Sequence, residues 1–117
     1  MQLWAYVKAS ENSNGGIFYR WNHLGDRGYE AQIYNVKGAT NMTGSIYNHA
    51  SAKDFLAKNG QWFLMQIVCK GNDSLVLING KPVAEYHETV ERAGHISLQM
   101  HSRNSNIHFK DIRIKPL

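Results

Sequence analysis

Two neighbouring segments with regular side-chain alternation, both between Gly15 and Ile33, constrain the fold of this chain most. The sequence predicts two strands here, GIFYR and GYEAQI, joined by a polar loop. Apolar side chains occupy one face of each strand, whereas Arg20, Glu30 and Gln32 point from the other face. Burying such polar groups without partners is costly, so this second face is expected to be solvated or to line a polar groove.

The same kind of pattern continues through the rest of the chain. Short apolar runs rich in aromatic and β-branched residues alternate with turns containing Gly and Asn, which favours an antiparallel β-sandwich over a helical bundle. We expect one all-β domain over residues 1–117, with about eight strands in two sheets that close as a jelly roll. A short strand is expected at 45–49, and a helix of about one or two turns only at 50–59.

Local signals predict two backbone features. The Asn79–Gly80 pair indicates a tight hairpin turn. In the last strand Phe109 and Ile112 are an odd number of residues apart, so a β-bulge near Lys110 and Asp111 is needed to keep both inward.

Several large apolar residues are expected in the core. Trp4 and Trp62 are placed there, together with the inward row Ile96, Leu98 and Met100 of a strand near the end of the chain. The opposite row of that strand carries polar residues, which are expected to face away from the core.

The net charge of +4 is modest. Basic residues cluster in the last strand, at His108, Lys110, Arg113 and Lys115. These residues alternate with apolar ones, which indicates a solvated outer face. A nucleic-acid partner is not expected, since no stacking-platform motif accompanies the charge.

Other features bear on the chain's environment. No apolar run approaches the ~20 residues that cross a bilayer, so no membrane association is expected. The start, MQLWAYVKAS, shows neither the basic region nor the cleavage site of a signal peptide. Cys69 is the only cysteine, which excludes an internal disulfide, and its apolar surroundings predict a buried thiol.

The acidic residues give little support to ordinary glycoside hydrolysis, which needs two carboxylates about 5 to 10 Å apart. Only Glu30 lies in the middle of a strand with a defined orientation, whereas Glu85, Glu88 and Glu91 lie near turns and are expected on the surface. There is no GxSxG motif for a serine nucleophile.

The six histidines show no metal-binding spacing such as HExxH, so scattered surface or structural roles are expected, with no metal site and no cofactor. Trp21 is a candidate for stacking on the apolar face of a sugar ring. The alternative is that it caps the end of the sandwich.

Several motifs occur in one order across nearly the whole chain: NGGIFYR, GYEAQI, TGSIY, GQW, LINGKPV and GHISLQMHSRNSNIHFKDIRIKPL. In these motifs the chain resembles the 3-keto-disaccharide hydrolase domain family, which has a concanavalin-like jelly-roll fold. The resemblance implies cleavage of glycosides whose sugar is oxidised to a ketone at C3. It suggests roles for seven residues: His101 or Glu30 as the base, Arg20 and Gln99 as oxyanion donors, and Gln32, Tyr47 and Trp21 as sugar contacts.

The resemblance leaves other roles open. A non-catalytic, lectin-like module could use the same concave face to bind a carbohydrate. Family members also have strands before the segment matching Leu3 to Lys8, which implies either a minimal variant or completion by a homo-oligomer or a second chain. The family resemblance suggests a periplasmic or secreted protein.

Overall fold

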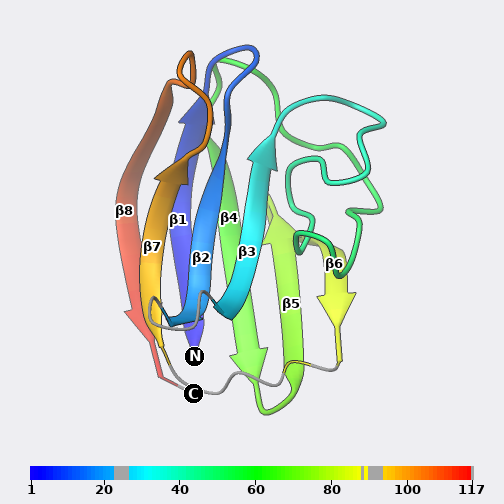
Figure 1. Ribbon diagram of the computed structural model, residues 1–117, viewed down its shortest axis with the longest axis vertical. Helices are drawn as coiled ribbons and strands as arrows, with labels where there is room; N and C mark the ends of the chain where they lie inside the picture. The colour runs from blue at the N-terminus through cyan, green and yellow to red at the C-terminus, as the bar shows by residue number, and fades with distance from the viewer. Residues whose placement is uncertain (23–26, 88, 90–93, 117) are drawn as a thin grey trace.

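The computed structural model describes residues 1–22, 27–87, 89 and 94–116, which form two antiparallel sheets packed face to face (Figure 1). The larger sheet has the order β6-β5-β4-β1-β8, and the smaller has the order β3-β2-β7. This confirms the predicted all-β sandwich. The strands are β1 (Gln2–Ala9), β2 (Asn14–Asn22), β3 (Arg27–Tyr34), β4 (Phe63–Lys70), β5 (Asp73–Ile78), β6 (Lys81–Tyr86), β7 (His95–Met100) and β8 (Ile107–Lys115).

Side-chain alternation builds the core between the sheets. Leu3 and Val7 of β1 and Ile67 of β4 are fully buried from one side, and Ile17 and Tyr19 of β2 are fully buried from the other. Cys69 at the end of β4 is buried, as predicted. In each central strand, every second side chain packs into this core. The side chains between them therefore point to the two outer faces of the sandwich.

Both predicted backbone features are confirmed. Asn79 and Gly80 have φ values of 52° and 81°, the left-handed conformation of a two-residue hairpin turn between β5 and β6. Asp111 has a φ of 52°, and the register of β8 against β1 shifts between Trp4 and Tyr6. This bulge is the one that the apolar spacing of the last strand requires.

The segment between β3 and β4 differs from the prediction. The helix expected at 50–59 is wrong, because backbone hydrogen bonds tie this stretch to its surroundings: Lys53 N donates to Val83 O at 2.8 Å and Gly60 N donates to Ala9 O at 2.9 Å. Buried Ala52 and Ala57 fix it further. None of the described residues forms a helix that is long and apolar enough to cross a membrane.

The strand expected at 45–49 is reduced to a bridge and a turn. Ile46 is bridged to Ala31 at the edge of β3 and to Ala50. Two further backbone bonds extend this contact: Gln32 N donates to Ser45 O and Tyr47 N donates to Glu30 O, both at 2.9 Å. The chain therefore runs beside β3 for only a few residues before it turns away.

The expected core positions of Trp4 and Trp62 are wrong, whereas Leu98 and Met100 face inward as predicted but are not covered. Trp62 is 40% exposed and Trp4 is half-buried, and the parity of β1 and β4 places both on the outer side of the larger sheet. Leu98 and Met100 have inward parity, yet they are 43% and 57% exposed. The reason is that β7 is the last strand of the smaller sheet, and the described chain does not cover the side of the sandwich where it lies. Ile96 is partly buried, closer to the prediction.

Candidate functional site

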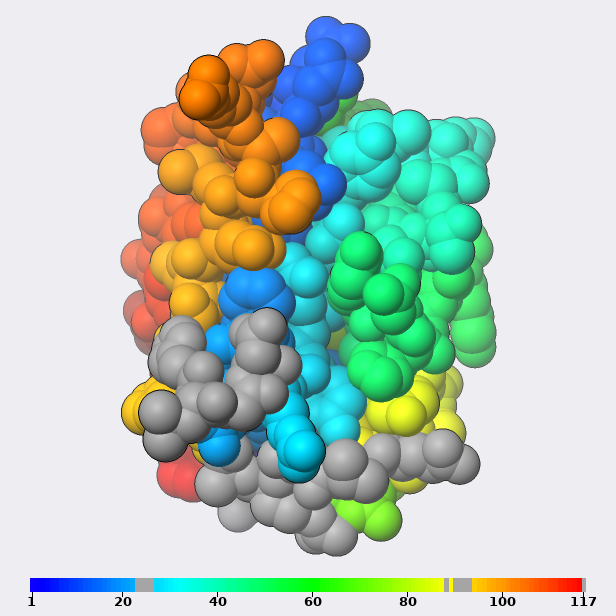
Figure 2. Space-filling view, viewed as in Figure 1, coloured from blue at the N-terminus to red at the C-terminus, as the bar shows by residue number. Residues whose placement is uncertain are grey.

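A pocket of about 400 Å³ lies on the outer face of the smaller sheet. Figure 2 shows the hollow on this face, over β2 and β3, between the orange strand β7 and the green segment that follows β3. Its lining comes from β2, β3, β7 and the two segments beside them: Asn14, Phe18, Trp21, Gly28, Glu30, Gln32, Tyr47, Asn48, His49, Gln99 and His101.

Strand register brings the polar side chains of the floor together. Gly16 of β2 pairs with Gln32 of β3 on one side and with Gln99 of β7 on the other. Two residues further along β2, Phe18 pairs with Glu30 of β3, and both side chains point to the same face. A Cβ atom at position 16 would clash with Glu30 Oε2 and would lie 2.8 Å from the backbone oxygen of Ala31, so glycine leaves room here for the carboxyl group above the sheet.

Burial changes the acidity of Glu30. The residue is 9% exposed, and removal from water raises the pKa of its carboxyl group from 4.5 to about 7. The protonated and ionised forms are therefore both populated near neutral pH. A carboxyl group in this state can accept or return a proton during a reaction.

Amide side chains surround this carboxyl group. In one amide orientation Gln32 Nε2 donates to Asn14 Oδ1 at 3.3 Å, and in the other, which matches donors to acceptors better, it donates to Gly15 O at 3.2 Å and Glu30 Oε2 at 3.3 Å. The backbone N of His101 donates to Asn14 O at 2.6 Å, which anchors the chain beyond β7 at the pocket.

Aromatic rings form one end of the pocket. The rings of Phe18 and Trp21 lie with their centroids 4.4 Å apart. Trp21 also packs over Gly28, where a Cβ atom would lie 2.7 Å from Trp21 Cε3. Of the two predicted positions for Trp21, stacking surface or end cap, the structure places the ring in the pocket lining.

The opposite wall comes from the turn after Ile46. Tyr47 is held to β3 through its backbone bond to Glu30 O. Asn48 has a φ of 60° and its backbone N donates to Asn41 Oδ1 at 3.0 Å. The His49 ring packs against the rings of Tyr29 and Tyr86, with centroid distances of 5.3 and 4.6 Å. These contacts place three side chains above the floor.

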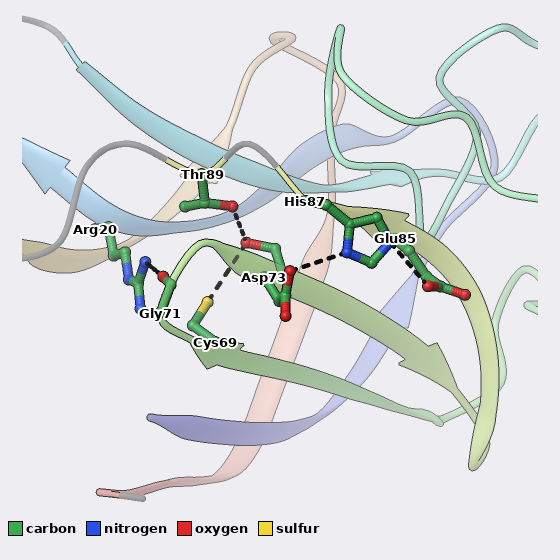
Figure 3. Close-up of polar contacts among 8 residues, drawn as sticks. Arg20, Cys69, Gly71, Asp73, Glu85, His87 and Thr89 are labelled. Carbon is green, nitrogen blue, oxygen red and sulfur yellow. Dashed lines mark hydrogen bonds and ion pairs between the residues drawn. The ribbon is translucent and has the colours of Figure 1, made fainter.

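Arg20 does not lie where its parity predicted. The register of β2 shifts against both neighbours after Phe18 and Tyr19, and Arg20 has a φ of 50°. This bulge turns the side chain away from the pocket, and Arg20 Nη1 donates to Gly71 O at 2.9 Å in the turn between β4 and β5 (Figure 3). The expectation that Arg20 shares a face with Glu30 is therefore wrong.

The other six predicted residues meet in one pocket: Glu30, Gln32, Gln99, His101, Tyr47 and Trp21. Sequence reasoning missed Asn14, Phe18, Asn48 and His49. Phe18 has the parity of the polar face and could have been found from it, whereas no periodicity indicates Asn48 or His49.

The remaining ionisable candidates do not enlarge the site. Glu85 is exposed on β6, away from the pocket lining, and His23, Glu88 and Glu91 lie outside the described residues. Within the described part of the chain, Glu30 is the one carboxylate of the pocket lining, and no group of three potential metal ligands comes together.

Comparisons with known proteins agree with this architecture. Residues 1–115 match the model of a family described as the 3-keto-alpha-glucoside-1,2-lyase-like domain, which confirms the resemblance seen in the sequence motifs. No curated protein matches the chain.

Among solved structures, the chain is similar to two proteins from Parabacteroides distasonis ATCC 8503, each described as a "putative glycosyl hydrolase". The first has a TM-score of 0.84 and 24% identity over 99% of this chain and 77% of its own. The second has a TM-score of 0.78 and 16% identity over 95% and 69%. The carbohydrate binding module CBM66 from Bacillus subtilis follows with a TM-score of 0.67 and 12% identity over 95% and 71%. These likenesses confirm the jelly-roll fold.

The acidity of Glu30 predicts a dependence of stability on pH. In the unfolded chain the carboxyl group ionises near pH 4.5, whereas in the folded protein it keeps its proton up to about pH 7. The free energy of unfolding should therefore fall as the pH rises through this window, by about 2 kcal/mol once partial solvation is allowed for. Urea unfolding of the wild type and of Glu30→Gln at several pH values measures this contribution, which the variant should lack.

The exposed Glu11 supplies the control for this measurement. Glu11→Gln should keep the wild-type dependence on pH. If Glu30→Gln lost as much stability as the wild type over the same window, the assigned burial of the Glu30 carboxyl group would be incorrect.

Proposed function

The chain belongs to the 3-keto-alpha-glucoside-1,2-lyase-like domain family, and from this premise we propose that its pocket cleaves the glycosidic bond of 3-keto-glycosides such as 3-keto-disaccharides. The observation that carries the proposal is a single buried carboxyl group, Glu30, whose pKa is raised to about 7 in a pocket of sugar-ring size. A reaction that starts with one proton transfer suits this site better than a mechanism that needs a pair of carboxylates.

The chemistry of the substrate explains why one base suffices. A ketone at C3 acidifies the proton on C2, so a base can remove it and leave an enolate on the C3 oxygen. The electron pair then forms the C1–C2 double bond as the C1–O bond breaks, and the departing oxygen takes up a proton. Addition of water across the new double bond completes a net hydrolysis without any change of oxidation state.

The pocket offers a group for each step. In this proposal Glu30 acts as the base, and His101 gives a proton to the departing oxygen. The alternative is that the two residues exchange these roles. The amides of Gln99 and Gln32 are donors for the oxygen on which charge develops. The C–H face of the sugar would rest against Trp21, as aromatic side chains combine an apolar body with a polar edge.

A non-catalytic carbohydrate-binding role is the second candidate. The observation that favours it is the lining itself, because the adjacent rings of Phe18 and Trp21 opposite exposed Tyr47 could hold a sugar without any reaction. The solved module to which the fold is similar is named as carbohydrate binding. Enzyme and module share the pocket but differ in the need for Glu30 and His101.

Turnover measured with a 3-keto-disaccharide and with its unoxidised parent separates the two candidates. We expect cleavage of the keto sugar only, with kcat/KM rising about tenfold per pH unit below about pH 7 as Glu30 loses its proton. Glu30→Gln and His101→Ala should each lower turnover by at least ~100-fold while the fold is retained.

The matched controls are Glu11→Gln and His108→Ala, which alter exposed residues outside the pocket lining and should keep wild-type rates. Binding of both sugars without turnover would favour the carbohydrate-binding module. An unchanged rate in His101→Ala would remove this residue from the mechanism.

We also propose that the open side of the sandwich pairs with a second copy of the chain. β7 and β8 are the outermost strands at the same side of the two sheets (Figure 1). Leu98, Met100, Ile112 and Ile114 on these strands are between 42% and 57% exposed although their strands place them among apolar residues. Unpaired edges beside exposed aliphatic side chains are typical of surfaces that associate.

Sedimentation tests this association. The wild type is expected as a dimer at micromolar concentrations, and the double variant Met100→Lys, Ile114→Lys as a monomer, because the lysines place charge on the associating surface. Val36→Lys changes a residue that is 38% exposed elsewhere and should leave the dimer intact. A wild type that remains monomeric at the highest soluble concentration would contradict the proposal.

A further inference from the structure

The outer face of the larger sheet carries a second cluster of aromatic side chains, on the opposite side of the sandwich from the pocket. Trp4 and Tyr6 alternate with the buried residues of β1, so both point outward. Trp62 lies immediately before β4 and is 40% exposed. The aromatic row therefore runs along β1 from Trp4 to Tyr6 and continues to Trp62, which lies at the start of β4 beside the end of β1.

Basic side chains run beside this row on β8. Trp4 pairs with Arg113 and Tyr6 pairs with Lys110, so each ring has a cation on the adjacent strand. The bulge at Asp111 keeps both of these basic residues on the outer face despite the change of register. Lys115 continues the basic row opposite Gln2.

Two lysines lie over the rings of Trp62 and Tyr6. Lys110 Nζ lies 4.2 Å from the centroid of the Trp62 ring and 5.8 Å from that of Tyr6, and Lys8 Nζ lies 5.1 Å from the Trp62 ring. At exposed positions such contacts contribute only about 0.5–1 kcal/mol each, so they orient the rings more than they stabilise the fold. In the described part of the chain, none of Lys8, Lys110, Arg113 and Lys115 forms an ion pair with a carboxylate.

A hollow of about 460 Å³ lies on the same face, beside Trp4 and Tyr6. Besides Trp4, Tyr6 and the basic residues Arg113 and Lys115, it is lined by Gln2, Leu64, Gln66 and Asp111. Amide and carboxylate groups are natural partners for hydroxyl groups, and the flat rings are natural partners for the C–H face of a pyranose. The hollow thus combines stacking surface, hydroxyl partners and positive charge.

We propose that this face is a second carbohydrate-binding surface, which takes polysaccharides that carry carboxylate or sulfate groups. Lysine and arginine side chains that form no ion pair with a carboxylate in the described part of the chain select the anionic groups. A nucleic acid fits less well, because the carboxylate of Asp111 can accept hydrogen bonds from the hydroxyl groups of a sugar, whereas the phosphodiester backbone of DNA has no such donors. The surface shares no residue with the pocket over β2 and β3, so the proposal holds or fails independently of turnover there.

Binding of polygalacturonate, dextran sulfate and neutral dextran to the full chain tests the proposal, measured by calorimetry at low and moderate salt. We expect one or both anionic polymers to bind, more weakly as salt rises, and neutral dextran to bind at least ~10-fold more weakly. Comparison of the two anionic polymers shows whether carboxylate or sulfate is preferred. Trp62→Leu and Lys110→Gln should each weaken binding by at least ~5-fold.

Lys53→Gln is the matched control, because it removes one charge from an exposed lysine whose backbone N is bonded to Val83 of β6, at the opposite edge of the larger sheet from β8, and it should bind like the wild type. Thermal unfolding confirms that each variant is folded, and turnover in the pocket should be unchanged in Trp62→Leu. Equal binding of neutral dextran, equal loss in Lys53→Gln, full binding in Trp62→Leu or tighter binding of a single-stranded oligonucleotide would each overturn the proposal. So would failure of both anionic polymers to bind.

Discussion

The position of the Glu30 carboxyl group against Gly16 is the contact on which the pocket depends. Strands β2 and β3 must pair in one register to bring these residues together, and any side chain at position 16 would take the space of the carboxyl group. The same contact removes Glu30 from water and raises the pKa of its carboxyl group. Packing of the backbone and acid–base chemistry are therefore linked at one point of the smaller sheet.

The remaining walls of the pocket are arranged around this point by different means. β7 adds Gln99 by regular strand pairing, whereas Tyr47 arrives through a short run of backbone bonds beside β3. The aromatic end depends on the bulge in β2, which brings Trp21 over Gly28. Regular pairing places the polar floor, and irregular backbone places the residues that would contact a ligand from the sides.

Much of this site follows from the sequence because parity in a strand is a local property. Glu30 and Gln32 share a face whatever their neighbours are, and the apolar spacing of the last strand itself requires the bulge at Asp111. The bulge at Arg20 leaves no such signal, since it depends on pairing with two other strands, and the prediction for Arg20 failed for this reason. Trp4 and Trp62 show a similar limit, because hydrophobicity indicates burial but not which side of a sheet is covered.

The turn that carries Tyr47, Asn48 and His49 is attached to the sandwich through the bridge at Ile46 and through backbone bonds between residues 43–47 and β3. Of these three side chains, His49 packs against the rings of Tyr29 and Tyr86 in the two sheets, whereas Tyr47 and Asn48 are exposed. Substitutions at Tyr47 and Asn48 would thus leave the floor beneath undisturbed. Such an arrangement separates the floor of the pocket, which is built by regular strand pairing, from a side wall that can vary while the floor stays fixed.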